Sequence, residues 1–208
     1  DLERTKVTLD KAANLLGKLG GERSRWEDQV NELRKRKGML PMETLVAAAF
    51  STYLGKKPED LRESAVDQWV QICKLERFDY RRLMSSESEQ LIWKAEGLPA
   101  DALSMQNAVI ILNDNGGRVP FIIDPAVTAT NWLKKNLGQD KKRPLEIVNR
   151  ADPKFVLKVE LAVRFGKTLM VVEADGVDPM LYPIVRQDLI HQGPRNVVQI
   201  GDKTIDYK

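Results

Sequence analysis

The amino-acid sequence predicts an α/β protein with a helical first half and a parallel sheet in its second half, and three observations support this fold class. Residues 1–37 contain no proline, and apolar residues recur there every seven positions. Residues 40–113 have the pattern of several shorter helices. After residue 117, strand-like and helix-like segments alternate, which is typical of parallel strands joined by crossover helices.

The seven-residue spacing in residues 1–37 predicts a coiled-coil-like seam. Eight of eleven positions in two interleaved heptad sets are apolar. The seam residues that we single out are Leu9, Leu16, Leu19, Trp26, Val30 and Leu33. An amphipathic helix lying on a bundle explains the same pattern equally well. Because the chain holds no second heptad stretch, a coiled-coil partner would have to come from outside it.

The middle of the chain carries start and stop signals of short helices. Pro41 and Pro58 occupy places that suit the first turn of a helix, and Gly97 suits a helix end. Ser86 followed by Glu89 is a capping-box pattern, in which each residue's side chain binds the other's backbone amide. We therefore expect a helical region at 38–115, separate from the seam helix at 1–37.

Residues 116–208 are expected to form a small sheet with helices. The predicted order is strand 119–123, helix 128–137, strand 145–148, helix 155–165 and strand 168–172. Residues 197–200 and 204–207 flank Gly201-Asp202 and predict a β-hairpin with a two-residue turn.

The segment between the first predicted strand and its helix stands where a phosphate-binding loop would lie. Against the pattern G-x-x-x-x-G-K-[ST], Asp124 and Ala129 replace the glycines, Thr130 replaces the lysine and Asn131 replaces the hydroxyl residue. Asp124 would place negative charge near the phosphates, and Pro125 removes one backbone N–H. We interpret residues 124–131 as a degenerate loop that does not hold a nucleotide.

A second acidic position follows the strand at 168–172. Glu173 keeps a carboxylate where a magnesium-supporting acid would stand, but Ala174 cannot orient a water molecule for attack. Four apolar residues and an acid are also what an ordinary buried strand end looks like.

Composition and residue content argue against several other functions. The 33 basic and 30 acidic residues nearly cancel, so nucleic acid is not an expected partner. Cys73 is the only cysteine and His191 the only histidine, and we expect no metal site and no catalytic residue in this chain. The longest apolar run, residues 45–50, is too short for membrane insertion.

Several stretches, in order along nearly the whole chain, resemble the fifth AAA+ module of dynein heavy chains and the base of the stalk helix that returns to it. The stretches are Leu19–Trp26, Gly97–Asn107, Ile123–Pro125, Trp132–Lys134, Arg164–Lys167, Val177–Pro179 and Ile200–Asp202. Glu89–Lys94 and Val198–Lys203 are similar to the cytoplasmic dyneins of intraflagellar transport. One departure is that family members commonly carry Gln-Gly-Gln where this chain has Ala126-Val127-Thr128.

The resemblance implies a function for each region. Residues 1–37 would end the stalk coiled coil, 38–115 would lead into the module, and 116–208 would form its α/β part, truncated before the sensor strand. The module would be non-catalytic and would couple ring conformation to the stalk, while other modules of the heavy chain bind ATP and magnesium. Implied partners are the remaining modules, the other stalk helix, the microtubule at the stalk tip, accessory chains and intraflagellar transport particles. The implied locations are the cytoplasm, the cytoskeleton and the cilium or flagellum.

Two alternatives from other classes stay open at this point. One is an active P-loop NTPase with a divergent loop, which predicts micromolar binding of Mg-ATP. The other is a coiled-coil scaffold, which predicts that residues 1–37 associate with one another.

Overall fold

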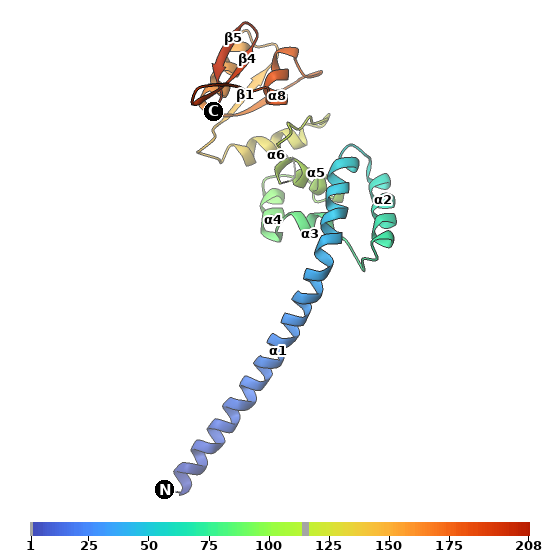
Figure 1. Ribbon diagram of the computed structural model, residues 1–208, viewed down its shortest axis with the longest axis vertical. Helices are drawn as coiled ribbons and strands as arrows, with labels where there is room; N and C mark the ends of the chain where they lie inside the picture. The colour runs from blue at the N-terminus through green and yellow to red at the C-terminus, as the bar shows by residue number, and fades with distance from the viewer. Residues whose placement is uncertain (1, 114–116) are drawn as a thin grey trace. The chain divides into compact units, whose positions relative to one another are not determined.

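The computed structural model describes residues 2–113 and 117–208, and the side chains of these residues other than 2, 3, 10 and 12–21 (Figure 1). The chain divides into two compact units, Asp1–Asp79 and Tyr80–Lys208. In the described part of the chain, no helix has the length and apolar character needed to cross a membrane.

The first unit is dominated by one long helix, α1 (Leu2–Ala49), drawn in blue in Figure 1. Its 48 residues span about 70 Å at the usual rise per residue. The expected helix end at Lys37 is wrong, because α1 continues through Pro41 and passes into a π-helical turn, η1 (Phe50–Leu54). An interior proline costs about 3 kcal/mol. Burial of apolar side chains just beyond it, such as Val46, offsets this cost and keeps the helix continuous.

Helix α2 (Glu59–Ile72) lies beside the C-terminal part of α1 and closes the small core of this unit. Its buried Arg62 donates hydrogen bonds to the carbonyl oxygens of Lys57 (2.8 Å) and Gly55 (3.0 Å). The guanidinium also lies 5.7 Å from the centre of the Phe50 ring. A cation thus satisfies carbonyls at the end of η1, where a helix leaves them without partners. The buried apolar residues of the unit are Val46, Ala47, Phe50, Leu54 and Leu75.

The second unit begins with short helices, as the sequence predicts. They are α3 (Tyr80–Met84), α4 (Glu87–Ala95), α5 (Ala102–Leu112) and α6 (Thr128–Leu137). The predicted capping box is confirmed, because the Glu89 amide donates to the Ser86 hydroxyl and the Ser86 amide donates to the Glu89 carboxylate. The helix predicted at 128–137 is also confirmed.

The α/β part follows α6 and contains two small sheets. Its elements are β1 (Leu145–Asn149), α7 (Phe155–Phe165), β2 (Thr168–Val172), η2 (Pro179–Leu181), α8 (Tyr182–Arg186), β3 (Ile190–Gln192), β4 (Arg195–Ile200) and β5 (Lys203–Asp206). Strands β1 and β2 pair in parallel, from Leu145 opposite Thr168 to Asn149 opposite Val172, and α7 is the crossover helix between them. Strands β3, β4 and β5 form an antiparallel sheet in that order.

Both sheets and α7 share one apolar core. Its buried members are Val148, Phe155, Val159, Val163, Leu181, Val198, Ile200 and Ile205. The predicted hairpin is confirmed as β4 and β5, with Ile200 opposite Lys203. Gly201 has a φ of 58°, which the first central residue of a type II′ hairpin turn requires.

Two features of this unit differ from the sequence-based prediction. Residues 119–123 are not a strand; they have no regular secondary structure, and Ile123 is 87% exposed. A strand needs a neighbour for its backbone groups, and Pro120 lacks one of the donors that a sheet would use. The parallel sheet therefore contains two strands in the described residues instead of three. Strand β3, in contrast, was not predicted, because its three residues are all exposed and carry no apolar alternation.

Candidate functional site

The candidate site is the loop that leads into α6. The backbone N–H of Val127 donates to the carbonyl oxygen of Asp124 (3.1 Å), which closes a turn with Pro125 at its second position. Asn131 then makes the first helical hydrogen bond, to the carbonyl of Val127 (3.1 Å). Val127 has a φ of 58°, a left-handed conformation that is rare for a β-branched residue. The loop therefore enters the helix through a strained residue.

The carboxylate of Asp124 binds the first turn of α6. One of its oxygens accepts from the amide of Thr128 (3.1 Å) and the other accepts from the amide of Thr130 (2.7 Å). Burial raises the pKa of Asp124, but hydrogen bonds from Thr130, Ala129 and Thr128 together outweigh this effect, so the pKa lies below its ordinary value. A negative charge at a helix N-terminus is also favoured by the helix dipole.

This arrangement leaves few hydrogen-bond donors and no lysine at the loop to bind a phosphate group. The amides at the start of α6, which a P-loop would turn towards its ligand, already donate to a carboxylate of the same chain. Thr130 stands at the lysine position of the pattern, so no side-chain cation replaces the lysine there. The sequence predicted that Asp124 brings negative charge to this loop, but not that its carboxylate would occupy the amides.

The body of α6 is fixed by contacts that the sequence did not reveal. Its buried Trp132 meets Trp93 of α4 edge to face, with ring centres 6.2 Å apart and planes at 75°. The buried Glu96 carboxylate accepts from the side-chain amides of Asn136 (2.9 Å) and Gln139 (2.8 Å). A charged residue next to Gly97 gives no sequence signal of burial, because its partners lie some forty positions away.

The second acidic position lies just beyond β2. Glu173 has a φ of 54° and accepts a short hydrogen bond from the side-chain amide of Asn149. Asn149 ends β1, and the carboxyl ends of parallel neighbours meet at one edge of a sheet, so this partner could have been inferred from the predicted topology. Ala174 adds no polar group. The same edge holds an ion pair between Arg150 and the carboxylate of Asp178 (2.5 Å).

The two degenerate positions have different hydrogen-bond partners. Asp124 binds α6, whereas Glu173 binds Asn149. Because residues 119–123 are not a strand of the parallel sheet, the sheet does not fix the loop beside Glu173. Among the residues that the structure describes, no group of His, Cys, Asp and Glu side chains is arranged to hold a metal ion.

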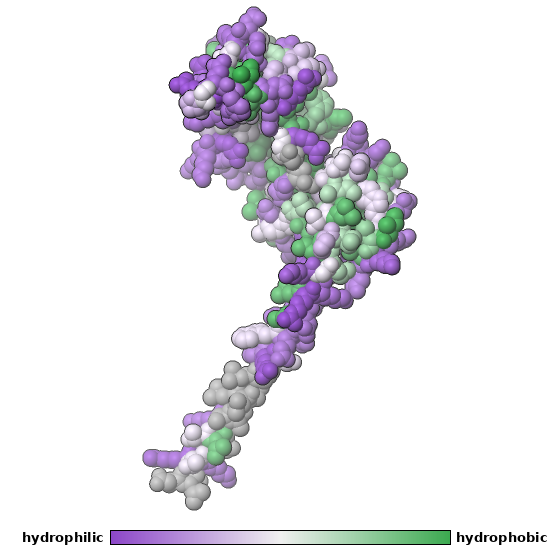
Figure 2. All heavy atoms as spheres, viewed as in Figure 1, coloured by the Kyte–Doolittle hydropathy of each residue, from purple (hydrophilic) through white to green (hydrophobic). Residues whose placement is uncertain are grey.

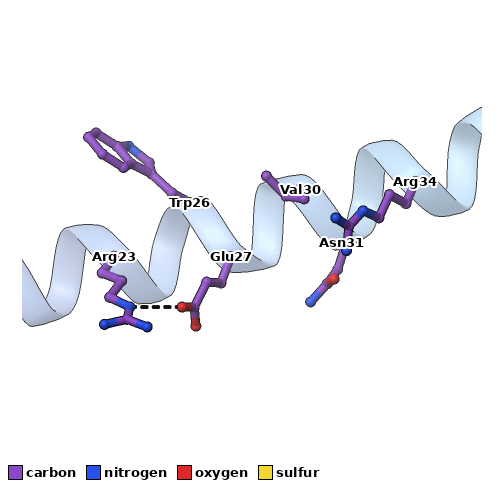
Figure 3. A pocket seen from close by; sticks show the side chains of 6 residues that line it. All are labelled: Arg23, Trp26, Glu27, Val30, Asn31 and Arg34. Atoms are coloured by element: carbon purple, nitrogen blue, oxygen red, sulfur yellow. Dashed lines mark hydrogen bonds and ion pairs between the residues drawn. The ribbon is translucent and has the colours of Figure 1, made fainter.

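The predicted seam residues lie on α1. Leu9, Trp26, Val30 and Leu33 are exposed, while the side chains of Leu16 and Leu19 lie outside the described residues. Figure 2 shows that the coloured residues on the stretch of α1 away from α2 are mostly hydrophilic, with hydrophobic ones interspersed. Trp26 and Val30 project from the same side of the helix and border a shallow surface groove, and Arg23 pairs with Glu27 nearby (2.9 Å; Figure 3). The seam itself stays a prediction.

Comparison with known proteins shows that this chain is similar to dynein heavy chains. Residues 91–208 match the family of ATP-binding dynein motor regions. The whole chain is 50% identical to cytoplasmic dynein 2 heavy chain 1 of Mus musculus and covers 5% of that protein. It is 49% identical to cytoplasmic dynein 2 heavy chain 1 of Chlamydomonas reinhardtii, with all of this chain and 5% of the relative covered. The dynein-1-beta heavy chain of the flagellar inner arm I1 complex, from the same alga, is 31% identical to this chain. That match covers 96% of this chain and 4% of the relative.

The strain at Val127 gives a prediction about stability. Replacing Val127 with glycine should raise the free energy of unfolding by about 1 kcal/mol, because glycine adopts the left-handed conformation without the clash of a β-branched side chain. Urea unfolding followed by tryptophan fluorescence measures the change.

Val156→Gly is the matched control. Val156 is 44% exposed and Val127 is 46% exposed, but Val156 lies in the ordinary helix α7. Glycine there should lower stability, since it is a poor helix former. A destabilisation of similar size in both variants would contradict the strain at Val127.

Proposed function

Because the chain belongs to the family of dynein motor regions, we propose that it serves as a non-catalytic, structural AAA+ module of a dynein heavy chain. The module would be the fifth of the ring, preceded by the end of the returning stalk helix. The chain spans 5% of the length of the cytoplasmic dynein 2 heavy chains that it matches, so the activity of a whole heavy chain is part of this proposal.

The observation that carries the non-catalytic role is the contact of Asp124 with the start of α6. A P-loop needs free amides and a lysine at this place, and here the Thr128 and Thr130 amides hold a carboxylate. At the second position Glu173 binds Asn149 and Ala174 cannot orient water. ATP and magnesium would act in other modules of the same heavy chain.

The mechanical role rests on α1. A continuous helix of 48 residues can carry a displacement along its axis, and a shift of one helical turn moves a seam by about 5.4 Å. The exposed apolar residues Leu9, Trp26 and Leu33 would pack against the other stalk helix. Through this displacement, the module would transmit changes in ring conformation to a microtubule-binding tip.

The identity values support a ciliary role. Within one alga, the cytoplasmic dynein 2 heavy chain is 49% identical to this chain and a flagellar inner-arm heavy chain only 31% identical. We assign the chain to the dynein 2 type, the retrograde motor of intraflagellar transport. Its partners would be accessory chains and transport particles in the cytoplasm and the cilium or flagellum.

Calorimetric titration with Mg-ATP tests the non-catalytic role. The chain should show no binding heat up to millimolar nucleotide, because the loop offers neither free amides nor a cation. The heavy chain that contains it should bind in the same titration, which serves as the positive control. Micromolar binding to the chain that is lost on Thr130→Ala would favour a divergent NTPase instead.

A pair of matched substitutions tests the mechanical role in the heavy chain. Leu9→Ala should weaken microtubule stimulation of the ATPase, since truncating a leucine packed in a seam removes about 2 kcal/mol or more of packing. Val7→Ala should leave the stimulation unchanged, because Val7 is an exposed apolar residue of α1 outside the two heptad sets. Equal effects, or none in either variant, would contradict a seam that contains Leu9.

A further inference from the structure

We propose that the seam of α1 selects an acidic partner, an amphipathic helix that carries glutamate or aspartate opposite Arg34, Arg36 and Lys37. This inference rests on the proposed function, in which exposed apolar residues of α1 pack against the other stalk helix. It deepens that function by naming the charge that the partner helix must carry at this place.

Four consecutive cations, at residues 34–37, lie inside α1, well before its end at Ala49. Cations are favoured in the last turn of a helix, where they offset the dipole, but the last turn of α1 carries none. Like charges three or four positions apart on a helix repel each other, as Arg34 and Lys37 do here. The helix itself therefore gains nothing from placing these cations together.

Heptad positions divide the four cations into three that face the seam and one that faces away. With Leu33 at position d of a heptad, Lys37 takes the following a position, inside the seam. Arg34 and Arg36 take positions e and g, which flank the seam on its two sides. Lys35 takes position f, on the opposite side of the helix. We call Arg34, Arg36 and Lys37 the seam-facing cations.

In the described part of the chain, only the outward-facing cation has an acidic partner. The ammonium of Lys35 lies 3.3 Å from the carboxylate of Glu76, which follows α2. No described residue forms an ion pair with Arg34, Arg36 or Lys37. The seam-facing cations are therefore available to a partner that covers the seam.

The preceding heptad differs, because its charge is neutralised within α1. Arg23 takes the a position of that heptad and pairs with Glu27 at 2.9 Å. Glu27 takes the e position, which Arg34 takes one heptad later. Trp26, Val30 and Arg34 nevertheless line the same shallow groove (Figure 3). The exposed apolar stripe thus runs towards unpaired positive charge on one side of the helix.

The charge of this surface distinguishes between possible partners. A parallel second copy of this chain would place Lys37 against Lys37 in the seam, which is unfavourable. A neutral helix would leave the seam-facing cations without partners. Carboxylates at the facing positions would form interhelical ion pairs, the interactions through which residues at e and g set partner choice in coiled coils. The surface therefore fits a helix with acidic residues.

The test is the binding of two synthetic helices to the chain, followed by fluorescence anisotropy of a dye on each helix. Both helices are about four heptads long with leucine at a and d, and they differ only in glutamate or lysine at e and g. The chain should bind the glutamate helix about tenfold more tightly, because each of three cations contributes a preference of about twofold to threefold. This preference should disappear at about 1 M salt, where exposed charges are screened.

Substitutions with matched controls locate the preference on α1. The chain with Arg34→Gln, Arg36→Gln and Lys37→Gln should bind both helices alike. Lys35→Gln should keep the preference, because this side chain faces away from the seam and pairs with the chain's own carboxylate. Glutamine at all three positions of Lys141–Arg143 should also keep it, since this change removes the same amount of charge from a loop outside α1.

Each other outcome would overturn the inference. Equal binding of the two helices to the unaltered chain, or an equal loss of preference in the Lys141–Arg143 control, would do so and leave the seam and the proposed function standing. Binding of neither helix would overturn it and would also count against the seam. Self-association of the chain in sedimentation, lost when the seam-facing cations are replaced, would assign this surface to a second copy instead.

Discussion

The carboxylate of Asp124 on the first turn of α6 is the interaction on which the account of this module depends. It satisfies amides that a helix start leaves without partners, and it does so with the charge that the helix dipole favours. The same pattern holds at the edge of the parallel sheet, where Glu173 binds Asn149 and Asp178 pairs with Arg150. The acidic groups at the two degenerate positions, Asp124 and Glu173, are thus bound to neighbouring groups of the chain.

Helix α6 is anchored along its length as well as at its start. Trp132 packs on Trp93, and Glu96 binds Asn136 and Gln139 near the C-terminal end of the helix. Burying a carboxylate is favourable only when donors satisfy it, and two side-chain amides do so here. The degenerate loop and α4 are thereby both held to α6, which suits the force-transmitting role that we propose.

The sequence was most informative where local signals and packing agree. The capping box at Ser86 and the β4–β5 hairpin each combine a turn or cap signal with apolar periodicity, and the structure confirms both. The strand predicted at 119–123 and the helix end predicted before Pro41 were wrong, because strand pairing and burial beyond the proline depend on residues distant in sequence. The replaced pattern at 124–131 indicated the loop before α6 as a candidate site, and this stays a prediction. The hydrogen bonds from the Thr128 and Thr130 amides to Asp124 could not be predicted, because they accompany a left-handed conformation at Val127 that valine rarely adopts.

The central claim is tested most directly by an NMR titration of the Asp124 carboxyl carbon together with the amide protons of Thr128 and Thr130. The hydrogen bonds lower the pKa of Asp124 in the folded chain, so this contact stabilises the fold above the unfolded pKa of about 3.9 and is lost as pH falls through the folded value. We predict a carboxyl pKa below the ordinary value of an aspartate, and amide shifts of both threonines that follow the same titration. An ordinary pKa, with amide resonances that do not respond, would show that the carboxylate does not hold the start of α6.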